Sequence, residues 1–147
     1  MIDLFISSIV KDNVVLTKYF GLSFNKINYI YITLITLISG IIVYLLNSII
    51  NLPFLIPFIA TIVIILISLL LKKFNIKIDN LMNTAILGII LLGLDYSFVK
   101  FIVYIVGSIL GLLLIYYVLS LFDKKLKNES IIFIAIGIMS MIFLRIG

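Results

Sequence analysis

The chain has 147 residues, of which 65% are hydrophobic and 12% are charged, and its formal net charge is +5. A soluble domain carries roughly 25% charged residues, so this chain cannot cover a globular surface in water, and we expect its solvent to be lipid. It contains no cysteine, histidine or tryptophan, which excludes disulfides, thiolate or imidazole metal sites and the Ser-His and Cys-His nucleophile pairs.

The first predicted membrane span, Ile2–Phe24, is interrupted by charge. Lys11, Asp12 and Asn13 lie in its middle. A Lys or Asp at the centre of a span costs about 2.5–3.5 kcal/mol, whereas each Leu, Ile, Val or Phe returns only about 0.3–0.6 kcal/mol. Either the helix breaks here and its freed backbone lines a protected cavity, or Met1–Val10 is only an interfacial segment. The residues alone leave both alternatives open.

Two apolar stretches of full length follow the first span. Tyr29–Ile50 and Leu52–Leu71 are each long enough to cross the hydrocarbon core, because about 20 helical residues span roughly 30 Å. Pro53 suits the start of a helix, where its missing N–H costs nothing, and Pro57 predicts a kink.

The fourth predicted span, Ile78–Val99, is also a broken apolar run. Polar side chains of Asn80, Asn83 and Thr84 take the place that the charges hold in the first span. Such residues often only hydrogen-bond neighbouring helices together. We favour a second interpretation, in which the two broken helices face each other at the membrane midplane around a functional site. The candidate midplane polar site comprises Lys11, Asp12, Asn13, Asn83 and Thr84.

The last two predicted spans are Phe98–Phe122 and Ile131–Arg145. Gly107 and Gly111 form a G-x-x-x-G motif in the fifth span, and this spacing lets two helix backbones approach closely, inside the subunit or against a partner. The sixth span is short, so it needs a thinner bilayer or a snorkelling Arg145.

Basic residues predict the topology of these six spans. Cytoplasmic loops are enriched in Lys and Arg, and eight of the eleven basic residues fall on one side if both termini lie outside. These eight are Lys18, Lys26, Lys72, Lys73, Lys77, Lys124, Lys125 and Lys127. We therefore interpret the positive charge as a topology signal in a cell (inner) membrane protein, and not as a nucleic-acid site.

Three spans on each side of the basic loop predict an internal repeat. The fold class is all-α, with one transmembrane domain over residues 1–147 and half-repeats at about 1–72 and 78–147. Because three is odd, the second half enters the membrane from the opposite face, which makes the repeat inverted.

Three motifs resemble those of the Rnf/Nqr membrane subunits, close to the RnfA/NqrE branch. The segment from Asp12 to Ser23, DNVVLTKYFGLS, resembles the first-helix signature Asn-Asn-x-Val-Leu-x-Lys-x-x-Gly-Leu-Cys. The segments Asn83–Gly88 (NTAILG) and Gly137–Met141 (GIMSM) are similar to Asn-Cys-Ala-Val-Leu-Gly and Gly-Leu-Met-Ser-Leu. The resemblance covers essentially the whole chain, in order, with shortened loops.

The resemblance implies six helices in an inverted repeat, both termini outside, and a homologous membrane partner of opposite topology inside a redox-driven sodium or proton pump. In that family two cysteines from each partner hold a [2Fe-2S] cluster at the membrane centre. Ser23 and Thr84 occupy these positions here, and the chain has no cysteine. Because such clusters need thiolates or, in one variant, histidines, we expect no cofactor.

Two functions remain open from the sequence. The first is a cluster-less subunit of an Rnf/Nqr-type complex, which supports a partner or retains an ion path near Asp12, with Lys11 as a competitor for the cation. The alternative is a small stand-alone transporter or channel, which an inverted repeat with midplane polar residues fits equally well. Neither interpretation assigns the chain a catalytic residue of its own.

Overall fold

The computed structural model describes residues 1–13, 29–50, 52–73 and 80–126, with only the backbone of residues 29, 30, 80–83, 116 and 118–126. The regular elements of this described part are all α-helices, so the predicted helical fold is confirmed there. They are α1 (Ile2–Ile9), α3 (Tyr29–Ile50), α4 (Ile56–Lys72), α5 (Asn80–Gly93) and α6 (Phe98–Leu126). The remainder of the first predicted span and the whole of Ile131–Arg145 lie outside the described residues.

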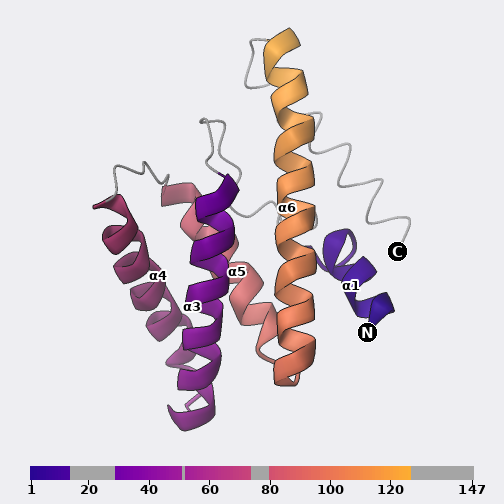
Figure 1. Ribbon diagram of the computed structural model, residues 1–147. Coiled ribbons are helices and arrows are strands. Elements are labelled where there is room, and N and C mark those ends of the chain that lie inside the picture. Colours follow the sequence, from indigo (N-terminus) through magenta and orange to yellow (C-terminus); the bar gives the residue numbers. More distant parts are fainter. Residues whose placement is uncertain (14–28, 51, 74–79, 127–147) are drawn as a thin grey trace.

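Helices α3 to α6 run alternately in opposite directions (Figure 1). The carboxyl ends of α4 and α6 and the amino ends of α3 and α5 lie on the same side of the bundle, which we name the upper end, and α6 extends beyond the other helices there (Figure 1). The α5–α6 turn marks the lower end (Figure 1). Helices α3 and α5 separate α4 from α6, and α1 packs on α6 alone among the described helices.

Two clusters of buried apolar side chains hold α3 to α6 together. One joins α3, α5 and α6, and the other joins α3, α4 and α5. The first contains Ile32, Ala85, Ile89, Phe101, Tyr104, Ile105, Ile109, Leu112 and Ile115. The second contains Ile35, Val43, Ile56, Ala60, Ile64, Ile67, Ile86 and Ile90.

Of the helices in the described part of the chain, two are long and apolar enough to cross a membrane. These are α3, over Tyr31–Ile50, and α6, over Phe98–Ile115. The helix predicted over Tyr29–Ile50 is confirmed, because α3 begins at Tyr29 and ends at Ile50. Its buried hydroxyls need no water, since Thr36 donates to the Ile32 carbonyl at 2.7 Å and Ser39 donates to that of Ile35. Helices α4 and α5 are apolar but shorter.

The expected kink at Pro57 is wrong. Helix α4 begins at Ile56, four residues later than predicted, so Pro57 lies in its first turn. A proline there removes no helical hydrogen bond. Residues before it form a turn in which the Leu55 N–H donates to the Leu52 carbonyl at 3.0 Å.

The fourth predicted span is not interrupted at Asn83 and Thr84. Helix α5 runs continuously from Asn80 and ends at Gly93. Asn and Thr lower helix propensity by less than about 1 kcal/mol each, which is far below the cost of a charge within a span. The helix therefore continues through both residues.

Candidate functional site

The first of the predicted polar segments terminates helix α1. The Ser7 carbonyl accepts the backbone N–H groups of both Val10, at 3.2 Å, and Asp12, at 2.8 Å. The chain thus turns back on itself after Ile9, and Lys11, Asp12 and Asn13 follow in the turn. The helix therefore ends just before the segment Lys11–Asn13.

Helix α6 approaches this turn through its two glycines. A Cβ atom at Gly107 would lie 2.9 Å from the Phe5 carbonyl oxygen and would overlap the Ser8 hydroxyl. At Gly111 a Cβ atom would overlap the Ile9 carbonyl oxygen and the Asn13 side-chain nitrogen. The G-x-x-x-G motif is therefore used inside the subunit, against α1.

Hydrogen bonds to the backbone seal the same contact. Asn13 is fully buried, and its amide donates to the Ser108 carbonyl at 3.0 Å and to the Ser8 carbonyl at 3.4 Å. From α6, the buried Tyr104 hydroxyl donates to the Asp12 carbonyl at 3.1 Å. The Ser8 carbonyl belongs to the last turn of α1, where the end of the helix leaves carbonyls without intrahelical partners. We name this set of contacts the α1–α6 seam.

The seam lies near the middle of Phe98–Ile115, the stretch of α6 that is long and apolar enough to cross a membrane. Gly107 follows the first residue of α6, Phe98, by nine positions (107 − 98 = 9). At 1.5 Å per residue this is about 14 Å along the axis, close to half of the roughly 30 Å hydrocarbon thickness. A chain turn at this depth has to be sealed by protein, since lipid offers no hydrogen bonds.

The charged side chains of the predicted site differ in their surroundings. Asp12 is half-buried and Lys11 is exposed. Among the described residues, His, Cys, Asp and Glu side chains do not gather in groups of three or more that could hold a metal ion. The seam joins α1 and α6 through hydrogen bonds between uncharged groups.

The other predicted site residues lie apart from the seam. Asn83 and Thr84 belong to the beginning of α5, where Thr84 is exposed. Helices α1 and α5 share no contact in the described part of the chain. The structure therefore brings Lys11, Asp12 and Asn13 together with α6, and does not bring them to Asn83 and Thr84.

The positions that would carry cluster ligands do not fit an iron–sulfur cluster. Thr84 offers a hydroxyl, Ser23 lies outside the described residues, and the chain has no cysteine or histidine. Clusters need thiolate or imidazole donors, so this donor set does not suit one.

Sequence reasoning missed three members of the seam, namely Ser8, Tyr104 and Ser108. Tyr104 carried a usable signal, because a phenol deep in an apolar span needs a hydrogen-bond partner. Ser108 sits beside Gly107 in the motif. Its hydroxyl is buried, and Ser108 contributes its backbone carbonyl to the seam.

Comparison with known proteins identifies no relative of this chain: no family model matches it, and neither a curated protein nor a solved structure is similar to it.

Proposed function

We propose that the chain is an integral membrane protein that crosses the bilayer six times as an inverted repeat. We further propose that it is a subunit of a larger complex resembling the Rnf/Nqr ion-translocating electron transport complex, without an iron–sulfur cluster of its own. The observation that carries the membrane assignment is the apolar outer surface of α3, α4 and α6. The complex is supported by the motif resemblance.

Large apolar side chains are exposed along each of these three helices. Leaving one such side chain in water costs about 1.5–3 kcal/mol relative to burying it, and soluble monomers rarely expose large contiguous apolar patches. Lipid removes this cost. The exposed set includes Leu34, Ile38, Ile41, Ile42 and Leu45 of α3, Phe58, Ile62, Ile65, Leu66, Leu69 and Leu70 of α4, and Val106, Leu110 and Leu114 of α6.

The seam favours a subunit over the alternative of a stand-alone transporter or channel. A transport path needs polar groups that can contact the moving ion or water. Here the Asn13 amide and the Tyr104 hydroxyl are committed to backbone carbonyls, and glycines bring the helices into direct contact. These groups are therefore not available to a moving ion at the seam.

Gentle purification from native membranes tests the proposal. A stoichiometric membrane partner of similar size supports the complex. A stable homo-oligomer that conducts ions after reconstitution would support the stand-alone transporter instead, and would contradict the subunit.

Crosslinking tests the inverted repeat separately. The chain has no cysteine, so the double variant Ser23→Cys/Thr84→Cys introduces the only two thiols. The proposal expects a short bifunctional reagent to join them. Labelling of the two positions from opposite membrane faces would reject the inverted repeat.

A further inference from the structure

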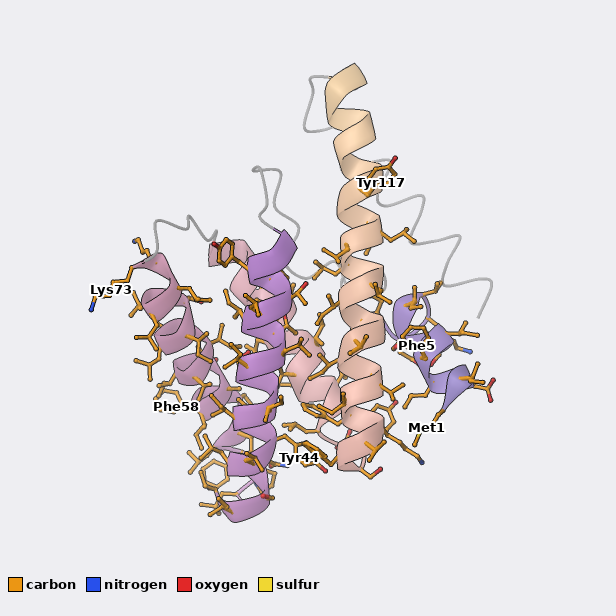
Figure 2. The ribbon with its side chains drawn as sticks, viewed as in Figure 1. Met1, Phe5, Tyr44, Phe58, Lys73 and Tyr117 are labelled. Atoms are coloured by element: carbon orange, nitrogen blue, oxygen red, sulfur yellow. The ribbon has the colours of Figure 1, made fainter. Side chains whose placement is uncertain are left out.

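The two ends of the helix bundle differ in charge. At the upper end, Lys72 and Lys73 close α4 and are both exposed, and Figure 2 shows Lys73 projecting from that end. The last turn of α6, which also lies at the upper end, contains Lys124 and Lys125. Asp123 is the single acidic residue beside them.

The lower end carries no such excess. The charges of the α5–α6 turn and of the beginning of α6 are those of Asp95 and Lys100, which are both exposed and cancel each other. The described residues that open α4, from Leu52 to Phe58, contain no charge. The bundle thus has one basic end and one end that is nearly neutral.

The position of the α4 lysines matches the boundary between hydrocarbon and headgroups. Leu70 is 64% exposed, and it lies one helical turn before Lys73. Residues three apart lie on the same side of a helix, so an apolar surface leads directly to an ammonium group. Lysines at such a boundary extend their charge toward the headgroups while the stem stays in the apolar layer.

We propose that the upper end binds the headgroups of anionic phospholipids, with Lys72 and Lys73 as the contact on the α4 side. This inference rests on the proposed membrane location. Each lysine near a membrane surface contributes about fivefold to the preference for anionic lipid. Two lysines therefore give a preference of roughly 5- to 30-fold over zwitterionic lipid at the end of α4.

The absence of tryptophan from the chain permits a site-specific test. Leu70→Trp places a fluorophore below the lysines, and Phe58→Trp places a matched one near the lower end of α4, where Phe58 is 66% exposed (Figure 2). Each full-length variant is reconstituted in phosphatidylcholine vesicles that contain brominated phosphatidylglycerol or brominated phosphatidylcholine. The ratio of quenching by the two brominated lipids reports the local lipid preference.

We expect the tryptophan at position 70 to prefer phosphatidylglycerol, and the tryptophan at position 58 to show a ratio near one. Adding Lys72→Gln/Lys73→Gln should bring the ratio at position 70 close to one, whereas Lys100→Gln at the lower end should leave it unchanged. Equal ratios at both positions, or a preference that survives the double substitution, would overturn the proposal. Absence of quenching by either lipid would instead refute the membrane location itself.

Discussion

Gly111 is the most sensitive position that we identify in the α1–α6 seam. In Gly111→Ala, the new methyl group would meet the Ile9 carbonyl and the Asn13 amide nitrogen. Overpacking typically costs about 1–3 kcal/mol. Because a backbone carbonyl can move away less easily than a side chain, we expect a cost of about 2–3 kcal/mol at Gly111. Alanine returns about 1 kcal/mol of helix propensity. The net loss of unfolding free energy should be about 1–2 kcal/mol.

The matched control is Gly40→Ala, which is the same substitution at another buried helical glycine. Its nearest neighbour would be the terminal Cδ1 methyl of Ile105 at 2.6 Å, which a rotation of that side chain can move away. Moving that side chain costs about 1 kcal/mol and alanine returns about 1 kcal/mol of helix propensity, so we expect almost no change in unfolding free energy. Both variants are compared by titration with SDS in mixed micelles, followed by circular dichroism. If Gly111→Ala is as stable as Gly40→Ala, α1 does not lie against Gly111 and the seam is wrong.

Three further predictions concern the seam and the membrane surface. Asn13→Ala should lower the unfolding free energy by about 1 kcal/mol, because the variant loses the hydrogen bonds to the Ser8 and Ser108 carbonyls. Each such bond inside a membrane contributes roughly 0.6 kcal/mol. An unchanged SDS midpoint would contradict this prediction. Tyr104→Phe should cost about 0.5–1 kcal/mol through the lost bond to Asp12, and the effect should vanish in an Asn13→Ala background if the two bonds act as one unit. Leu66 is exposed on α4, and in Leu66→Cys the new thiol should resist a water-soluble maleimide in vesicles, because a thiol in hydrocarbon stays protonated and out of reach. The thiol of Lys73→Cys should react. Equal labelling of the two variants would place α4 in water.

The sequence predicted where the helices lie better than it predicted which helices contact each other. Tyr29–Ile50 is a helix with the predicted bounds, because a long apolar run can satisfy its backbone in lipid only as a helix or a closed barrel. Boundaries set by local chemistry were harder to predict. Pro57 fits either the first turn of a helix or a kink within one, and the packing of Ile56 in the core selects the first.

The candidate site was predicted only in part. Lys11, Asp12 and Asn13 end a helix as their charge and polarity indicate, since an uninterrupted span cannot carry two charges at its centre without large cost. The predicted partners in α5 were not found beside them, and the resemblance to Rnf/Nqr subunits remains a prediction. An inverted-repeat pattern states which segments correspond, but it does not state which faces of two helices meet.

Composition alone determined that this chain forms apolar helices suited to lipid, because apolar content and span length act locally along the backbone. Only the tertiary structure decided what seals the end of α1. The bonds from Asn13 to Ser108 and from Tyr104 to Asp12 join residues 95 and 92 positions apart. Such contacts depend on the rotation and depth of two helices relative to each other. The G-x-x-x-G pattern of Gly107 and Gly111 predicts a close approach, but it does not state that the approaching segment is α1.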